Sequence, residues 1–389
     1  MTELSNSLVH YYSDHINDVV ALTTTLANFE TPTADKAHVD QMGSYLSQYL
    51  TELGAKVERI PRQEVGDILL AKWNAAAPGK PLMFMMHMDT VWPLGTLAQR
   101  PVHVEGDRLI GPGVWDMKVS IAMVLTAIKG LRDRSEFPDR PIWALFTSDE
   151  ETGSVYSQDT ITKYAAQAGL CLVMEFASPG NGGVRTWRKG VAHYTVNVKG
   201  LSSHAGNAPE KGINAVVEIA HQTLRISELN RMEHGTSVSV TVINGGIAFN
   251  VIPASASAQV DVRFLTKVES ERIDQTLHTL KPVLPGAEVT TTLNGQIRPP
   301  MERDDMMIHN YEQLRDLALQ LDFELLEDGS GGGSDGNFTA GMGIPTLDGL
   351  GAMGEGAHAN HEQAVISSIP VRTALLDLII RQWVFVDQD

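Results

Sequence analysis

The chain is poor in the residues that characterise several common classes of protein. Only one of its 389 residues, Cys171, is a cysteine, so no disulfide can form within the chain and nothing indicates an oxidising compartment. Basic residues number 30 against 47 acidic ones, which gives a formal net charge of −17. Such a charge repels the phosphates of nucleic acids and of anionic membranes, so we expect neither as a partner.

Long apolar runs and a targeting segment are missing as well. The apolar runs are shorter than the about 20 residues that a helix needs to cross a bilayer. Residues 1–20 contain no basic region followed by an apolar stretch and a cleavage site. We therefore expect an acidic protein of the cytoplasm. Its composition, 43% hydrophobic, is typical of globular domains. Its length predicts two domains at roughly 150 residues per domain.

After two amphipathic helical patterns, short apolar runs alternate with helical stretches. This alternation predicts an α/β fold with a mixed, mostly parallel sheet flanked by helices. Four apolar runs, at 82–86, 142–146, 170–174 and 344–347, each lead to acidic or histidine residues. Because ligands bind beyond the carboxyl ends of the strands in such sheets, we expect those side chains at one edge.

The middle of the chain has a different pattern. Alternating segments at 193–199, 238–243, 256–264 and 288–293 predict strands, and residues 212–229 and 268–280 predict helices. The order βαββαβ is that of a complete ferredoxin-like unit. We therefore expect residues 186–296 to form a small domain, inserted into a larger one made of residues 1–185 and 297–389.

The polar residues at the expected sheet edge form a candidate metal site. They are His87, Asp89, Asp116, Glu150, Glu151, Glu175 and His358. Carboxylates gathered in one cleft repel one another, and burying them without compensation is unfavourable. Two metal ions would remove this repulsion, and nitrogen and oxygen ligands without thiolate suit zinc, with cobalt or manganese as substitutes.

Two short motifs within this set have a geometric explanation. Residues i and i+2 of a strand point to the same side, so Asp89 can accept a hydrogen bond from the second ring nitrogen of His87 and orient the ring. Glu150 and Glu151 are adjacent and diverge. One of them can therefore bind metal while the other faces the attacking water as general base.

Each residue also has an ordinary structural explanation. A histidine after a strand is commonly a surface residue, and adjacent glutamates commonly lie in a solvated loop. Asp116 could cap a helix, and Glu175 could pair with Arg185 or Arg188. These explanations suit single residues but not a set that follows four strands of one sheet. We therefore favour the metal site.

Four segments resemble the motifs of the dizinc exopeptidase and amidohydrolase family. That family includes glutamate carboxypeptidases of the carboxypeptidase G type, acetylornithine deacetylase, succinyl-diaminopimelate desuccinylase and the aminoacylases. The segments begin at His87, Gly111, Thr147 and Gly356, and they occur in family order over nearly the whole chain. Glu175 and residues 250–255 resemble the glutamate carboxypeptidase branch in particular.

The resemblance implies a role for each residue of the candidate metal site. Asp116 would bridge two zinc ions, with His87 and Glu175 completing one site and Glu151 and His358 the other. Glu150 would be the catalytic base, and Asp89 would orient His87.

The resemblance also implies that the inserted domain is a lid that forms a homodimer. The motif Ser203-His204-Ala205-Gly206 matches one whose histidine acts in the partner's active site; the alternative is a loop histidine that caps the next helix. Asn250 and Arg263 would bind the terminal carboxylate of the substrate, unless Arg263 forms an ordinary ion pair.

Two further residues resemble substrate-binding positions of the family. Arg298 is similar to an arginine that reads the side-chain carboxylate of glutamate substrates, and a surface arginine is the alternative. Gly333 belongs to a turn similar to one that lines the substrate in the family, and a plain flexible loop is the alternative.

The sequence departs from the family pattern at Val119, at residues 183–185, and at Ala177, which replaces a proline often found two residues past the glutamate ligand. Val119 stands where a glycine usually follows Asp-x-Lys, which could change the start of the next helix. Gly183-Val184-Arg185 occupies the region of the lysine and serine that read glutamate in the carboxypeptidase branch. This departure leaves the preference for glutamate open, with Arg185 as a substitute cation.

We expect a metal-dependent hydrolase that cleaves an amide or peptide bond next to a free carboxylate. The leading hypothesis is a glutamate carboxypeptidase-like exopeptidase that acts on small peptides and releases a C-terminal amino acid. An N-acyl amino acid deacylase is the alternative, and a non-catalytic binding protein on the same scaffold is a remote third. Aminopeptidase relatives are expected to lack the lid, so the lid favours substrates recognised through a carboxylate.

Overall fold

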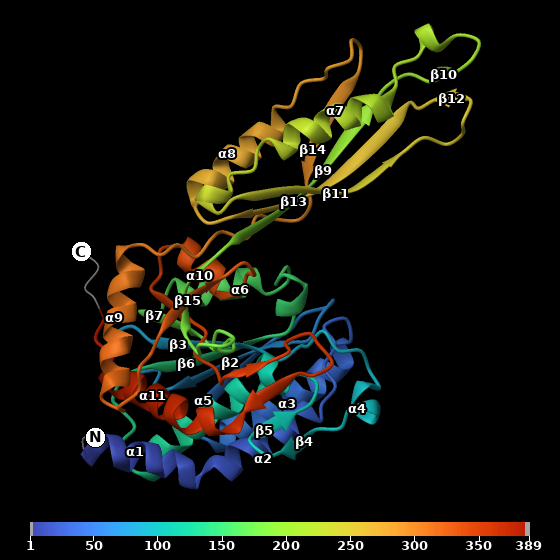
Figure 1. The fold of residues 1–389 in the computed structure, drawn as a ribbon. Coiled ribbons are helices and arrows are strands. Elements are labelled where there is room, and N and C mark those ends of the chain that lie inside the picture. The colour runs from blue at the N-terminus through green and yellow to red at the C-terminus, as the bar shows by residue number, and fades with distance from the viewer. Residues whose placement is uncertain (1–2, 386–389) are drawn as a thin grey trace. The chain divides into compact units, whose positions relative to one another are not determined.

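The fold is described from a computed structural model, which describes residues 3–385 (Figure 1). The chain divides into two compact units. The first consists of Met1–Thr186, Arg303–Gly329 and Ser334–Asp389, and the second consists of Trp187–Glu302 with Ser330–Gly333. The insertion expected at 186–296 thus extends to Glu302, and the segment that contains Gly333 groups with it.

The first unit is built on an eight-stranded mixed sheet. In spatial order its strands are β1 (Lys56–Ile60), β2 (Ile68–Trp73), β6 (Ile142–Thr147), β3 (Leu82–His87), β7 (Leu170–Val173), β16 (Thr346–Asp348), β8 (Val184–Arg188) and β15 (Glu327–Ser330). The four central strands β6, β3, β7 and β16 are parallel and correspond to the four predicted apolar runs. The predicted fold class is therefore confirmed, and the carboxyl ends of these strands meet at one edge.

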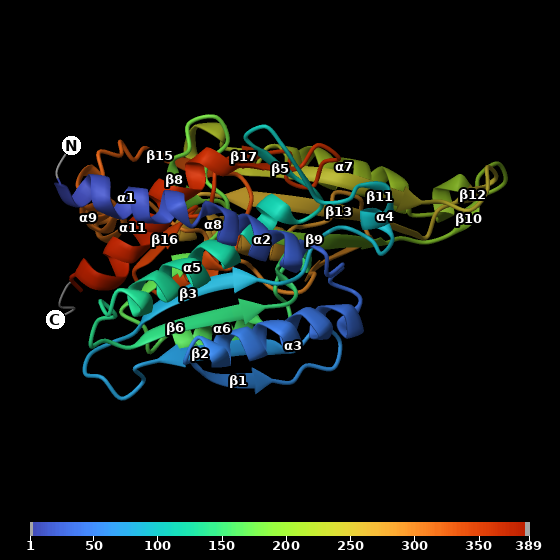
Figure 2. The ribbon, with the colours of Figure 1, turned by 90° about the horizontal axis from the view of Figure 1, so that it is seen from below.

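Helices flank this sheet (Figure 2). They are α1 (Glu3–Asp14), α2 (Ile16–Ala27), α3 (Lys36–Glu52), α4 (Thr96–Gln99), α5 (Val119–Asp133), α6 (Gln158–Ala165), α9 (Asp305–Leu319), α10 (Gly336–Gly341) and α11 (Ile369–Gln382). Helix α5 packs against α2 and α11 and is buried almost all round, as expected for a central helix. Among residues 3–385, no helix is long and apolar enough to cross a membrane.

A core cluster shows how the sheet is covered on one face. Met83 and Met85 of β3 alternate with residues that point the other way, and they pack with Ile161 of α6 and Phe338 of α10. A second, smaller sheet, in the order β17 (Gly354–Glu355), β18 (Gln363–Val365), β5 (Arg108–Ile110) and β4 (His103–Glu105), joins two loops of the first unit. These loops carry His358 and Asp116.

The second unit has the predicted βαββαβ order. Its elements are β9 (Gly190–Lys199), α7 (Ala215–Ser227), β11 (Ser237–Gly245), β13 (Ser255–Phe264), α8 (Lys267–His278) and β14 (Glu288–Leu293). The strands pair antiparallel in the order β11-β13-β9-β14, which is the ferredoxin-like arrangement. Alternate residues of β9 and β13 are buried with Ile219 of α7 and Ile273 of α8.

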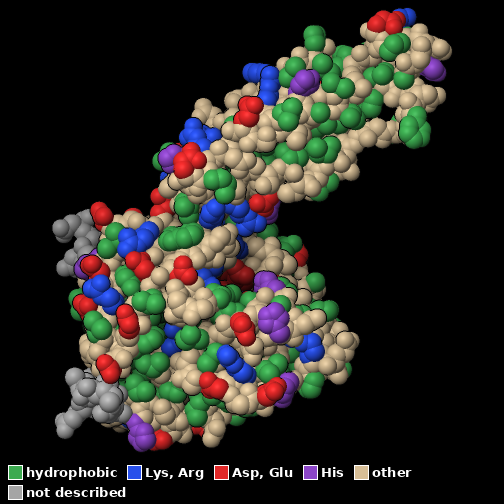
Figure 3. All heavy atoms as spheres, viewed as in Figure 1, with side chains coloured by type: hydrophobic (Ala, Val, Ile, Leu, Met, Phe, Trp, Pro, Cys, Tyr) green, Lys and Arg blue, Asp and Glu red, His purple; other side chains and the backbone are tan. Residues whose placement is uncertain are grey.

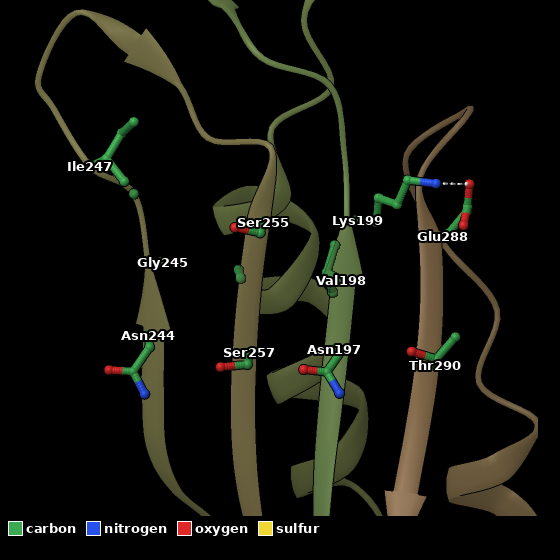
Figure 4. A pocket seen from close by; sticks show the side chains of 12 residues that line it. Asn197, Val198, Lys199, Asn244, Gly245, Ile247, Ser255, Ser257, Glu288 and Thr290 are labelled. Carbon is green, nitrogen blue, oxygen red and sulfur yellow. Dashed lines mark hydrogen bonds and ion pairs between the residues drawn. The ribbon is translucent and has the colours of Figure 1, made fainter.

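The opposite face of this four-stranded sheet is polar. Figure 4 shows Asn244, Ser257, Asn197 and Thr290 side by side on four neighbouring strands, where they line a shallow pocket of about 500 Å³. Beyond one end of the sheet, β10 (Ser203–His204) and β12 (Val251–Ile252) form a short two-stranded ribbon (Figure 1). The sheet therefore has helices on one face only.

Candidate metal centre

The sheet edge of the first unit brings the predicted metal-binding residues together. His87 is the last residue of β3, Glu150 and Glu151 form a helical turn after β6, and Glu175 follows β7. Asp116 lies in the turn before α5, and His358 lies in the loop between β17 and β18. In Figure 3, histidine side chains lie next to recessed acidic side chains on the visible face of this unit.

Asp116 lies between two histidines. Its Oδ1 is 3.1 Å from Nε2 of His87, and its Oδ2 is 3.2 Å from Nε2 of His358. Each carboxylate oxygen therefore faces a different imidazole. This is the arrangement that a bridging carboxylate of a dinuclear site needs. His358 has a φ of +61°, in the left-handed region that is uncommon for non-glycine residues.

The glutamates divide between the two histidines. Oε2 of Glu151 is 3.0 Å from Nε2 of His358, and Oε1 of Glu175 is 3.7 Å from Nε2 of His87. A ligand atom of Glu150 lies within 4.8 Å of ligand atoms of both His87 and Glu175. Glu150 therefore lies near His87 and Glu175, whereas its neighbour Glu151 lies against His358.

Asp89 supports both halves from behind. Nδ1 of His87 is 3.0 Å from the Asp89 backbone oxygen and 3.5 Å from its Oδ1. The backbone N–H groups of Glu150 and Glu151 donate to Oδ1 and Oδ2 of Asp89 at 3.3 and 3.2 Å, and the Thr33 hydroxyl donates at 2.7 Å. Asp89 therefore contacts the His87 ring mainly through its backbone oxygen, and not through its carboxylate as expected, while its carboxylate holds the turn that carries both glutamates.

The charges of the site are strongly coupled. Burial, followed by the nearby charge of Asp116, raises the pKa of Glu151 to about 7. Hydrogen bonds to Asp116 and Glu151 raise the pKa of His358 to about 11. Burial opposes ionisation of Asp116, but the hydrogen bonds from His358 and His87 outweigh it and hold the pKa of Asp116 below its usual range. Positive charge placed among these carboxylates therefore stabilises the site.

The donor set fits divalent metal ions. Oε1 of Glu151 is buried and has no hydrogen-bond partner among the described residues. Two overlapping groups of ligand atoms lie within 4.8 Å of one another, His87 with Glu150 and Glu175, and His87 with Asp116 and Glu151. Two divalent cations would balance the negative charge of four carboxylates, and one of them could bind Oε1 of Glu151.

The segment around Asp116 keeps a required glycine and accommodates Val119. Gly113 has a φ of +71°, and a Cβ at this position would lie 2.7 Å from Cγ2 of Thr90, so a glycine is needed here. Val119 begins α5 with φ −62° and ψ −37°, which are ordinary helical values. The predicted change in the helix start caused by Val119 is therefore not found.

Sequence reasoning missed one residue of this region. Glu362, four residues after His358, has no exposed surface and accepts hydrogen bonds from the loop that carries Asp116. The sequence around this glutamate does not indicate which distant loop its side chain contacts. Its spacing from a candidate ligand histidine was the only signal available.

The remaining predicted residues lie in the second unit, in two groups. His204 and Asn250 belong to the ribbon of β10 and β12, where the Ala205 N–H donates to the Asn250 backbone oxygen at 2.9 Å. Nδ1 of His204 accepts from the N–H groups of Gly206 and Asn207 at 3.1 and 3.0 Å. This local cap places the ring proton of His204 on Nε2.

The second group lies at the other end of the four-stranded sheet. Arg263 and Arg298 both pair with Val191. A Cβ on Gly333 would lie 2.7 Å from Cδ of Arg298, so Gly333 makes room for that side chain. Arg263 forms two hydrogen bonds of 3.0 Å with Asp261 through Nε and Nη2, which is the ordinary ion pair considered above.

Arg185, considered above as a partner of Glu175 or as a substitute cation, lies in the first unit. Its side chain is buried, donates to the Phe176 carbonyl and stacks on the Phe176 ring. It therefore has a structural role next to Glu175.

We expect Asp89→Asn to weaken metal binding by about 10- to 100-fold, because an amide NH₂ would face donors that now find a carboxylate. Titration of the metal-free protein against a chelator measures this affinity. Asp377→Asn is the matched control, since Asp377 is also fully buried in the first unit but pairs with Tyr12 and Arg381. An unchanged affinity in folded Asp89→Asn would contradict the supporting role.

Comparisons with known proteins agree with this geometry. The family model of peptidase family M20/M25/M40 matches residues 83–382. Carboxypeptidase G2 of Pseudomonas sp. (strain RS-16) is 33% identical over 94% of this chain and 89% of its own length. A succinyl-diaminopimelate desuccinylase of Delftia acidovorans is 28% identical over 83% of this chain and 88% of its own length.

Among solved structures, aminopeptidase PepT from Bacillus cereus has a TM-score of 0.78 at 22% identity, covering 94% of this chain and 98% of that one. That coverage leaves out far fewer residues than Trp187–Glu302 contains, so the expectation that aminopeptidases lack the inserted domain is wrong for PepT. The presence of the inserted domain therefore does not by itself select a substrate class. The family match over most of the sequence shows that the chain belongs to peptidase family M20/M25/M40, whose members are metal-dependent hydrolases.

Proposed function

We propose that the protein hydrolyses an amide or peptide bond next to a free carboxylate and releases a C-terminal amino acid, as a glutamate carboxypeptidase-like enzyme. The observation that carries this proposal is the position of Asp116, whose two oxygens face His87 and His358. Two zinc ions would bind per subunit, one with His87 and Glu175 and the other with Glu151 and His358. Cobalt or manganese could replace zinc.

Two metal ions in such a site lower the pKa of a water and polarise the substrate carbonyl. The protein supplies the proton transfers. Glu150 accepts the proton of the attacking water and then donates it to the departing amine. Its place on the turn held by Asp89, one residue from Glu151, keeps its carboxylate at the edge of the metal-binding set.

His204 is proposed to stabilise the negative charge that develops on the carbonyl oxygen. Because its Nδ1 accepts two backbone N–H groups, its Nε2 carries the proton and acts as the donor. The alternative for His204, a cap on the next helix, is not found, because Asn214 caps α7 and the two bonds of His204 lie within its own turn.

The positions of Asn250 and Arg263 support a site built from two chains. Ser255 pairs with Lys199 and Arg263 with Val191, so eight residues of β13 separate them, about 26 Å at about 3.3 Å per residue. Asn250 lies on the ribbon beyond Ser255. One substrate carboxylate is far smaller than this span, so Asn250 and Arg263 would come from different chains if both bind it.

An exposed edge in the second unit supports such a homodimer. Strand β11 is at the edge of its sheet, and Ile243 near its end is 50% exposed. The side chains of Ile247 and Phe249, just before Asn250, are 91% and 109% exposed. An unpaired strand edge with large apolar side chains nearby favours pairing with a second copy of the chain.

Arginines of the second unit are proposed to bind the anionic substrate. The protein carries a formal charge of −17, so an anion needs local cations against the overall field. Arg263 bonds Asp261 through Nε and Nη2 and not through Nη1, and Arg298 lies against Gly333. A guanidinium group can bind a carboxylate through two hydrogen bonds, so these residues would select substrates with carboxylates.

The second candidate is an N-acyl amino acid deacylase, favoured by the similarity to a desuccinylase and by Gly183-Val184-Arg185 in the region where the carboxypeptidase branch has a lysine and a serine. A panel of N-acyl-glutamates, folate-like compounds, dipeptides and N-succinyl amino acids separates the two. We expect the highest kcat/KM for substrates that release a C-terminal glutamate, because Arg298 offers a second cation. Faster turnover of N-succinyl substrates would favour the deacylase.

We expect Glu150→Gln to lower kcat by about 10²- to 10⁴-fold, the usual contribution of a general base, without removing the metal ions. Steady-state kinetics with elemental analysis of the same preparations test this. Glu64→Gln, at an exposed site away from the metal-binding set, is the control. A folded wild-type protein that binds no divalent metal, or full activity in Glu150→Gln, would refute the proposed function.

Mixed dimers test whether His204 acts across subunits. Co-expression of a Glu150→Gln chain with a His204→Ala chain places an intact Glu150 and an intact His204 at one site of each mixed dimer. Random pairing should then restore about a quarter of wild-type activity, because half of the dimers are mixed and one of their two sites is complete. Mixtures as inactive as the separate variants would contradict this arrangement.

A further inference from the structure

Glu362 closes the loop that carries Asp116. Its Oε1 accepts from the backbone N–H groups of Trp115 and Asp116 at 3.0 and 3.1 Å. Its Oε2 accepts from the Gly113 N–H at 2.9 Å and from Nε1 of Trp92 at 2.8 Å. The side chain has no exposed surface, so water does not compete for these four hydrogen bonds.

The same residue belongs to the loop that carries His358. The Glu362 N–H donates to the Ala359 oxygen at 3.0 Å, and the Gly111 N–H donates to the Glu362 backbone oxygen at 3.3 Å. Immediately after Glu362, β18 pairs with β5, with Gln363 opposite Ile110. Glu362 therefore joins the two loops through both its backbone and its side chain.

All four partners of the side chain are donors, which only an ionised carboxylate can satisfy with two hydrogen bonds at each oxygen. A glutamine would keep one oxygen, and its NH₂ group would face the other pair of donors. The requirement for a carboxylate is therefore electrostatic and not one of size. Through these bonds Glu362 holds the backbone N–H groups of Trp115 and Asp116, next to the side chain proposed to bridge two metal ions.

We propose that Glu362 is a positioning residue, which sets the distance between Asp116 and His358 so that both can bind the same metal ion. Asp116 and His358 come from segments far apart in the chain, and their side chains meet at 3.2 Å. Loss of the Glu362 carboxylate would release the Asp116 loop and change this distance. The inference rests on the metal ligands of the proposed function but not on its substrate.

The test compares Glu362→Gln with Glu218→Gln. Glu218 is an equally buried carboxylate of the second unit that accepts the N–H groups of Val283 and Leu284 and a bond from Gln222. For each variant, cobalt(II) is titrated into the metal-free protein, and the dissociation constant, the visible absorption spectrum and the midpoint of thermal unfolding of the metal-free form are measured.

We expect Glu362→Gln to raise the cobalt dissociation constant by about 10- to 100-fold and to change the absorption spectrum, as losses of supporting groups at metal sites do. Glu218→Gln should leave both unchanged, although its unfolding midpoint falls. Wild-type affinity and spectrum in Glu362→Gln would overturn the inference and leave the proposed function standing. A wild-type protein that binds no cobalt would instead refute the metal site itself.

Trp92→Phe keeps the test decisive if Glu362→Gln does not fold. This change removes only the donor at Nε1 and keeps an aromatic ring beneath Arg100. A severalfold rise in the cobalt dissociation constant, about tenfold at most, is expected because one of four donors is lost. An unchanged constant and spectrum in Trp92→Phe would overturn the positioning role.

Discussion

The repulsion among four carboxylates at one sheet edge is the constraint on which the candidate site depends. Asp116, Glu150, Glu151 and Glu175 lie within reach of two histidines, and burial makes their negative charges unfavourable. Burial lowers the pKa of His87, but its hydrogen bond with Asp116 helps to outweigh this and raise the pKa, and a hydrogen bond with Asp116 also raises the pKa of His358. The carboxylates therefore stabilise positive charge on both histidines. Divalent metal ions are the cations that this set of nitrogen and oxygen atoms fits.

Two further carboxylates hold the site from outside, and they do so by accepting hydrogen bonds from the backbone. Asp89 accepts the N–H groups of the turn with Glu150 and Glu151, and Glu362 accepts those of the loop with Asp116. Each carboxylate thereby fixes a loop that the parallel sheet alone leaves undetermined. The strand ends bring the ligands to one edge, and these carboxylates set their final distances.

The two units contribute different groups to the proposed reaction. The first unit gathers acidic side chains for metal ions, whereas the second offers the cations Arg263 and Arg298 at one end of its sheet and the hydrogen-bond donor His204 at the other. Because these ends are separated by the length of β13, a complete site would need residues from two chains. This requirement connects the proposed chemistry to the exposed edge of β11.

The sequence by itself determined the sheet, the inserted βαββαβ unit and the group of acidic and histidine side chains at the sheet edge, because apolar runs and alternation report burial directly and motif residues follow the strands in order. It did not determine the hydrogen bonds of Glu362, which join residues about 250 positions apart, or the contact of Gly333 with Arg298. These depend on which loops meet. A contact between residues far apart in the chain leaves no local pattern, so only the tertiary structure decided them.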